Sequence, residues 1–197
     1  MPQTLSTPAI SLRCRPWREQ DLLVDAYTFE QGKVSLLVRG GLRLSSKLAA
    51  HLEPFTLLEL MVITGRGFPT AASASSRNCY PLLKGDYDKI AAAGWAIGRF
   101  NKLVQEGVRD DTLFHLLTDF FALLNEAKAE SAWYQWLAKM FLVFALQQLG
   151  HGLPFEEKKN TFNSLYEAAS AKLTRKEFET MNKRLDLWLP AALENAV

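Results

Sequence analysis

Five short segments in the first 80 residues have the composition of β-strands, and this feature limits the possible folds more than any other. The segments are residues 8–15, 22–29, 33–39, 55–64 and, more weakly, 68–75. The first three alternate apolar and polar residues, which predicts strands because successive side chains point to opposite faces. The fourth is apolar almost throughout, as in a strand covered on both faces. Turn-forming residues separate the segments, namely Pro16, Gly32, Gly40-Gly41 and Gly65-Arg66-Gly67.

A short helix is predicted over residues 45–52, between the third and the fourth strand. Five short strands with a helix at this point match the outline of an OB-fold, a partly open Greek-key barrel. The rest of the chain is apolar with helical spacing. We therefore expect an α+β protein, with a five-stranded OB-fold β-barrel in residues 1–80 followed by an all-α helical domain in residues 81–197.

The helical part has several recognisable helix starts. Asp86 or Asp88 begins a helix that runs to about residue 105, and Asp110 or Asp111 begins the next. Residues 132–149 are apolar nearly all round, which predicts a central helix. A capping box at residues 174–177 precedes an amphipathic stripe. The aromatic residues of these helices either fill the core or line a groove for a peptide, and their pattern favours the core.

Basic residues are concentrated in the predicted barrel. Residues 1–80 hold nine Lys and Arg against six Asp and Glu, a net charge of +3, whereas residues 81–197 hold 14 against 15. A positive excess favours a polyanionic partner. The candidate DNA-binding residues are Arg13, Arg15, Arg18, Lys33, Arg39, Arg43, Lys47 and Arg66.

The alternation also predicts which side chains face outward. In the first strand the expected inward set is Ile10, Leu12 and Cys14, and the outward set is Ser11, Arg13 and Arg15. Tyr27 and Phe29 are expected on the outward face of the second strand, where their rings could stack on bases. The alternative is an ordinary solvated sheet face whose aromatic residues are covered by the helical domain. The pattern alone leaves both open.

Several short pieces of the sequence, in order along the chain, carry a family resemblance. In the barrel they are Ser11-Leu-Arg-Cys-Arg-Pro-Trp-Arg-Glu-Gln-Asp, Thr28-Phe-Glu-Gln-Gly-Lys-Val, Val38-Arg39-Gly40-Gly41, Leu52-Glu-Pro-Phe and Gly65-Arg66-Gly67. In the helical part they are Ala91-Ala-Ala-Gly, Thr112-Leu-Phe-His-Leu-Leu and Leu149-Gly150-His151-Gly152. Together they resemble the bacterial recombination mediator family RecO, roughly over residues 8–152.

The resemblance implies a function in DNA repair and recombination after DNA damage. RecO proteins have an N-terminal OB-fold and a helical domain, bind single- and double-stranded DNA, and anneal complementary strands. With RecR they help load RecA onto strands coated by SSB, whose acidic C-terminal tail docks on the helical domain. Lys139 resembles a basic residue near that tail site. The expected location is cytoplasmic and nucleoid-associated, with no membrane contact.

The chain also departs from the family pattern. Many members carry a four-cysteine zinc motif after the Leu-Gly position, but no cysteine follows Leu153 here, so we expect no zinc. The chain is shorter than usual after Gly152. A segment of Phe-Glu-Leu type is present as Phe141-Leu142-Val143, with Leu142 replacing the acidic residue.

No catalytic constellation stands out in the sequence. Gly32-Lys33-Val34-Ser35 lacks the spacing of a P-loop, and the three histidines have no Cys or His at ligand spacing. Cys14 and Cys79 are far apart, which predicts neither a disulfide framework nor a metal site. We expect a non-enzymatic mediator without a cofactor. The alternatives are a protein-interaction adaptor with a RecO-like fold that has largely lost DNA binding, and an OB-fold regulator with an unrelated role.

Overall fold

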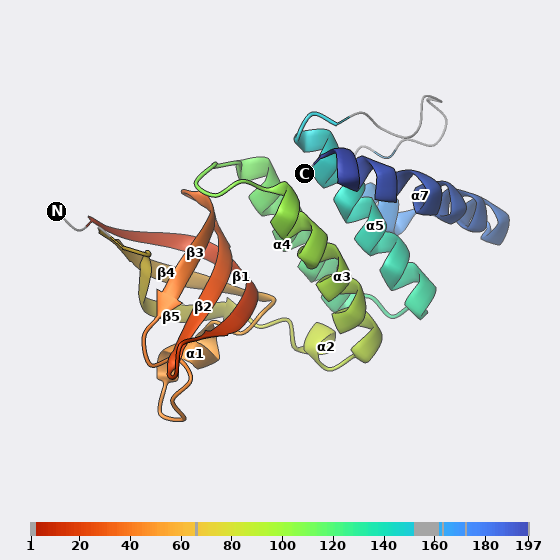
Figure 1. Ribbon diagram of the computed structural model, residues 1–197. Coiled ribbons are helices and arrows are strands. Elements are labelled where there is room, and N and C mark those ends of the chain that lie inside the picture. Colours follow the sequence, from red (N-terminus) through yellow and green to blue (C-terminus); the bar gives the residue numbers. More distant parts are fainter. Residues whose placement is uncertain (1–2, 66, 152–161, 163, 172, 197) are drawn as a thin grey trace. The chain divides into compact units, whose positions relative to one another are not determined.

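The computed structural model describes residues 3–65, 67–151, 162, 164–171 and 173–196. Its strands are β1 (Gln3–Trp17), β2 (Asp21–Thr28), β3 (Gly32–Val38), β4 (Thr56–Thr64) and β5 (Thr70–Asn78). They close a barrel in the order β1-β2-β3-β5-β4 (Figure 1). Helix α1 (Lys47–His51) follows β3 and precedes β4 in the chain. A five-stranded barrel with this helix is an OB-fold, so the predicted α+β fold is confirmed.

Strand β1 is the longest because it pairs with two neighbours. Its first half pairs with β4, from Gln3 opposite Thr64 to Ser11 opposite Thr56. Its second half pairs with β2, as far as Trp17 opposite Asp21. The strand therefore begins five residues before the predicted start at residue 8.

A β-bulge in β1 changes the predicted inward and outward sets. The register against β2 shifts between Ser11 and Arg13, and one inserted residue moves the following side chains to the other face. Ser11, expected outside, is buried, and its Oγ donates to the carbonyl oxygen of Leu52 at 2.7 Å. Ile10, expected inside, lies opposite Tyr27, while Ala9 contributes to the barrel core. The predicted facing of Ile10 and Ser11 was therefore wrong.

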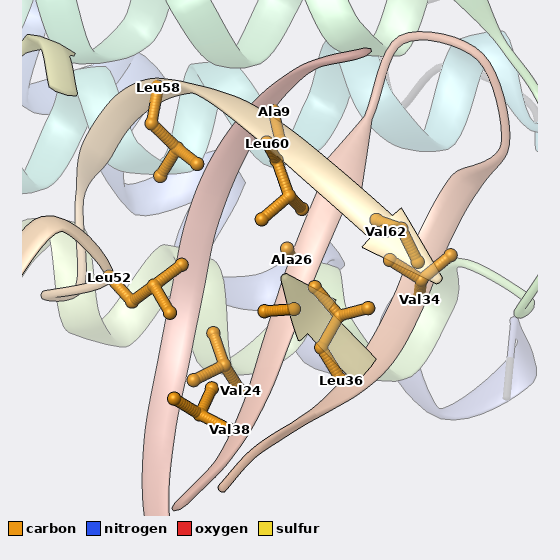
Figure 2. Packing of buried hydrophobic residues seen from close by; sticks show 11 residues of the cluster. Ala9, Val24, Ala26, Val34, Leu36, Val38, Leu52, Leu58, Leu60 and Val62 are labelled. Atoms are coloured by element: carbon orange, nitrogen blue, oxygen red, sulfur yellow. The ribbon is translucent and has the colours of Figure 1, made fainter. Parts of the chain in front are cut away.

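The interior of the barrel is a single apolar cluster from all five strands. Val34, Leu36 and Val38 of β3 face inward as predicted. Figure 2 shows Val34 beside Val62 of β4, and Val38 beside Val24 of β2. The rest of the cluster comprises Ala9, Ala26, Leu52, Leu58, Leu60 and Ala71.

The helical part begins directly after β5. Its helices are α2 (Pro81–Lys84), α3 (Tyr87–Leu103), α4 (Asp111–Glu126), α5 (Ser131–Gln148), α6 (Leu165–Ser170) and α7 (Arg175–Asn195). Asp86 Oδ1 accepts from the amides of Asp88 and Lys89 at the start of α3, and Asp110 Oδ1 accepts from the Leu113 amide in α4. The capping box of Thr174 and Glu177 is also present, and the hydrogen bonds from Thr174 lower the pKa of Glu177.

Helix α5 is buried nearly all round, as its composition predicted. The Phe141 ring stacks on Phe120 of α4, with 4.5 Å between the ring centroids. The Phe100 ring of α3 lies 5.5 Å from Phe141. Three helices thus share one aromatic core. Helix α7 buries Met181, Leu185 and Leu189.

Contacts between residues divide the chain into two compact units. One contains residues 1–80 together with residues 104–114, and the other contains residues 81–103 and 115–197. The barrel unit thus includes a segment that follows α3 in the sequence. We call residues 104–114 the return segment. The predicted division into domains 1–80 and 81–197 stays a proposal.

Candidate nucleic-acid interface

Two of the predicted DNA-binding arginines lie on the second half of β1. Beyond the bulge, Arg13 is opposite Asp25 of β2, and Arg15 is opposite Leu23. Arg13 is exposed. The Arg15 guanidinium is 3.5 Å from an Asp25 carboxylate oxygen, and this carboxylate also accepts from Ser35 Oγ at 3.0 Å. Arg13 is therefore the better placed of the two to contact a phosphate.

Three further predicted cations lie in turns at one end of the barrel. Arg18 follows β1, and Arg39 and Arg43 follow β3; all three are exposed. The two turns are tied together, since the Leu42 amide donates to the Gln20 carbonyl oxygen at 2.9 Å and Arg43 Nε to Gln20 Oε1 at 2.7 Å. The sequence thus places three positive charges on neighbouring turns.

The loop between β4 and β5 reaches the same end. The Leu37 amide of β3 donates to the Pro69 carbonyl oxygen at 2.8 Å. The Trp17 and Phe68 rings form an edge-to-face pair with centroids 6.0 Å apart. We call the turn at residues 18–20, the turn at residues 39–46 and the loop residues 65 and 67–69 the loop end of the barrel. Arg66, predicted to bind DNA, lies outside the described residues.

Trp17 and Phe68 are aromatic residues that the alternation within the strands does not indicate as base-stacking candidates. They are 36% and 54% exposed. Each directly adjoins a turn, next to Arg18 and Gly67 respectively. An OB-fold binds oligonucleotides partly through its loops. Large aromatic residues at the boundaries of predicted loops could therefore have indicated these two residues from the sequence.

The predicted stacking residue Tyr27 does not face solvent. It is 1% exposed, and its hydroxyl lies 3.5 Å from the Asp110 carbonyl oxygen of the return segment. Burial, followed by the charges of Asp110 and Asp111, raises its pKa. Tyr27 is not part of the barrel core, so its predicted place on the outward face of β2 is confirmed, but the return segment covers its ring and leaves it closed to stacking bases. A segment 80 residues later in the chain covers the ring, which no local pattern indicates.

Phe29 and Lys33 also contact the return segment. The Phe29 ring packs edge-to-face on Phe114 at 5.4 Å, and the Arg109 guanidinium lies 5.0 Å from the Phe29 ring centroid. Lys33 Nζ donates to the Val104 carbonyl oxygen at 3.3 Å, and the Lys33 carbonyl accepts from the Gly107 amide. Of the side chains predicted to face outward, Arg39 lies at the loop end, whereas Tyr27, Phe29 and Lys33 contact the return segment.

The return segment adds negative charge to this face. Ser35 Oγ donates to Glu106 at 2.6 Å, and Arg109 pairs with Asp111 at 2.8 Å and with Glu30 at 3.1 Å. The hydrogen bond to Asp111 raises the pKa of Arg109. Exposed carboxylates repel phosphates, so the loop end suits a nucleic acid better than the face under the return segment. Lys47, the last predicted cation, is exposed at the start of α1.

The predicted partner residue Lys139 lies in the helical unit. It is 9% exposed, and its Nζ contacts the Asp186 carboxylate at 2.5 Å and Asn182 Oδ1 at 2.7 Å. Lys139 and Asp186 line a pocket of about 400 Å³ together with Trp95 and three alanines of α3 and α5. Arg99 stacks over Trp95, 4.1 Å from its ring centroid, and lines an adjoining pocket.

Within the described ranges, no three or more His, Cys, Asp or Glu side chains gather as they would around a metal ion. The segment after Gly152 in which the family's zinc motif would fall lies mainly outside those ranges. None of the described helices is long and apolar enough to span a membrane.

The fold and site define the chain as an OB-fold protein with a basic, aromatic loop end and a helical domain. Residues 1–80 match the family model described as "Recombination protein O N terminal". The matching relatives are curated DNA repair proteins named RecO. That of Geobacter metallireducens is 26% identical over 126 residues, and that of Anaeromyxobacter dehalogenans is 34% identical over 125 residues.

These alignments extend past the barrel, since they are longer than 80 residues. They cover 64% and 62% of this chain, and 52% and 49% of the two relatives. A third RecO, from Pelotomaculum thermopropionicum, is 27% identical over 143 residues, which is 73% of this chain and 54% of that protein. The chain is thus similar to RecO proteins over 62–73% of its length. It spans about half the length of the curated relatives it matches.

Proposed function

We propose that this chain is a non-enzymatic DNA-binding recombination mediator that acts in DNA repair. The family match over the OB-fold barrel carries this proposal, because the matching relatives are named DNA repair proteins. Binding single- and double-stranded DNA, annealing complementary strands, and loading RecA with RecR onto SSB-coated strands belong to the same proposal.

The exposed cations at the loop end and on the second half of β1 support single-stranded DNA as the ligand. Guanidinium groups contact phosphate oxygens strongly, and each neutralised phosphate releases counterions. Arg13, Arg18, Arg39 and Arg43 are all exposed. If they neutralise four phosphates, the slope of log affinity against log salt is about −2.8, so fourfold more salt weakens binding roughly fifty-fold.

Replacing three of these cations tests the proposal. We expect the variant Arg13→Gln/Arg18→Gln/Arg39→Gln to bind a labelled single-stranded oligonucleotide more weakly and with a slope of about −0.7. Fourfold more salt should then weaken binding only about threefold. Fluorescence anisotropy at several salt concentrations measures both quantities.

A charge-matched control removes three exposed cations from the helical unit. Lys128, Lys176 and Arg184 are exposed, and their replacement by Gln changes the net charge equally. We expect the control to keep most of the salt slope. An equal loss of salt slope in both variants would mean that DNA binding depends only on the net charge of the protein. No binding by the unaltered protein at low salt would contradict the proposal.

The second candidate function is a protein-interaction adaptor that has largely lost DNA binding. The observation that favours it is the use of predicted DNA-binding groups within the fold, since Arg15 pairs with Asp25 and Lys33 contacts the return segment. Absent DNA binding together with binding of the acidic SSB tail peptide would support this alternative.

The pocket beside Lys139 is our proposed site for that acidic tail. Asp186 already pairs with Lys139, so an incoming carboxylate competes with it. We expect Asp186→Asn to tighten binding of a synthetic SSB tail peptide by up to about fivefold, the scale of one partly exposed ion pair. Lys139→Gln should weaken it. Equal peptide affinities in titrations of all three proteins would place the tail elsewhere.

A further inference from the structure

The loop end of the barrel carries an exposed aromatic pair. Trp17 and Phe68 contact each other, yet both remain partly open to solvent. Their planes are inclined at 66°, so planar groups stacked on the two rings would not be parallel to each other. The pair therefore offers two differently oriented aromatic surfaces rather than one continuous one.

The surroundings of the pair are cationic. Arg18 adjoins Trp17 in the chain, and the turn carrying Arg39 and Arg43 is hydrogen-bonded to the turn carrying Arg18. Rings that stack on bases, flanked by cations that contact phosphates, are the two components of a single-strand binding site. A polypeptide partner would need apolar anchors and acidic groups in a fixed pattern, whereas a nucleic acid repeats a flat base and a phosphate at every step.

The outward face of β2 offers no comparable site. Leu23, Asp25 and Tyr27 are at most 3% exposed. The return segment covers Tyr27, and its carboxylates lie beside β3. Many OB-folds bind their ligand across the second and third strands as well as through the loops. Among the described residues of that surface, the loop part combines partly exposed rings with exposed cations, and the outward face of β2 does not.

We infer that Trp17 and Phe68 stack on two unpaired bases of a single DNA strand whose backbone follows Arg18 and Arg39. The strand crosses the loop end of the barrel and avoids the face covered by the return segment. This inference rests on the proposed DNA-binding function and assigns its base-contacting residues. Since stacking requires bases freed from pairing, the pair also confers a preference for single strands over duplexes.

The test compares two oligonucleotides of equal length and charge. One is oligo-dT, and the other has the same phosphate backbone with abasic residues throughout. Stacking on aromatic side chains contributes about 1–3 kcal/mol per base, so the unaltered protein should bind oligo-dT at least about fivefold more tightly. The variant Trp17→Ala/Phe68→Ala should lose that preference and keep the salt slope, because it removes no charge.

Controls separate stacking from folding. Tyr87 is 84% exposed in the helical unit, so Tyr87→Ala is an aromatic deletion that should leave the oligo-dT preference unchanged. Trp17→Phe keeps a ring and should keep most of the preference. Thermal unfolding of each variant checks that the barrel is intact. The comparison of the two oligonucleotides with the unaltered protein needs no variant at all.

The outcomes distinguish this inference from the function on which it rests. No binding of either oligonucleotide at low salt overturns both. Salt-dependent binding with equal affinity for oligo-dT and the abasic strand keeps DNA binding and overturns the stacking role. An oligo-dT preference that survives in Trp17→Ala/Phe68→Ala also overturns it, because other rings must then contact the bases.

Discussion

Gly32→Ala should lower the free energy of unfolding by about 3 kcal/mol or more. Gly32 has φ +64°, and a Cβ there would lie 1.9 Å from the Val108 carbonyl oxygen. The contact is with backbone, so the return segment must move. Its hydrogen bonds to Lys33 and Ser35 would then be weakened. Urea unfolding followed by circular dichroism measures the loss.

Gly107→Ala is the matched control, since it lies in the return segment itself. Gly107 also has positive φ, +76°, but nothing lies within 4 Å of a Cβ built there. Only the cost of the left-handed backbone conformation remains, so Gly107→Ala should lower the free energy of unfolding by about 1–2 kcal/mol. Equal losses for the two variants would contradict the close approach of Val108 to β3. A larger loss for Gly32→Ala would support it.

Leu142→Glu should destabilise the helical unit by about 3 kcal/mol or more at pH 7. Leu142 is 0% exposed in α5, so the new carboxylate would be buried. Burial raises the pKa of a carboxyl group, and the folded state then binds more protons than the unfolded state. Stability relative to the unaltered protein should therefore improve as the pH falls toward 4. Thermal unfolding of both proteins across this pH range tests the sign of the pH dependence.

Leu142→Met is the control for that variant. It keeps the apolar character and nearly the volume, so it should cost less than about 1.5 kcal/mol and show no pH dependence of its own. A Leu142→Glu variant as stable as Leu142→Met at pH 7 would contradict the buried position. The burial of Leu142 is the reason why we expect this position to reject an acidic residue.

Local signals predicted the elements of this fold well. The alternation in residues 33–39 identified β3 and its inward set, and the capping residues Asp86, Asp110 and Thr174 marked true helix starts. These features depend on neighbours within four residues. Their physical causes are therefore contained in short stretches of sequence, which is why they could be inferred without a structure.

The errors arose where distant segments meet. The bulge at Ser11 shifts the pairing of β1 with β2 by one residue, and no residue type in the sequence indicates a bulge there. Tyr27 is covered by residues that follow it by about 80 positions, and Trp17 meets Phe68 across 51. The role of Lys139 in partner binding stays a prediction, but its pairing with Asp186 of α7 could not be inferred from α5 alone. Periodicity describes the face of one element and says nothing about what covers it.

The return segment has a consequence for how the chain folds during synthesis. Strand β5 ends at Asn78, but the barrel unit is complete only with Phe114, after α3 has been made. At roughly 5–20 residues per second, the ribosome needs about 2–7 s for those 36 residues. Throughout that interval the Tyr27 ring and Lys33 have no covering segment. The barrel therefore reaches its final form only when translation has passed into the second unit.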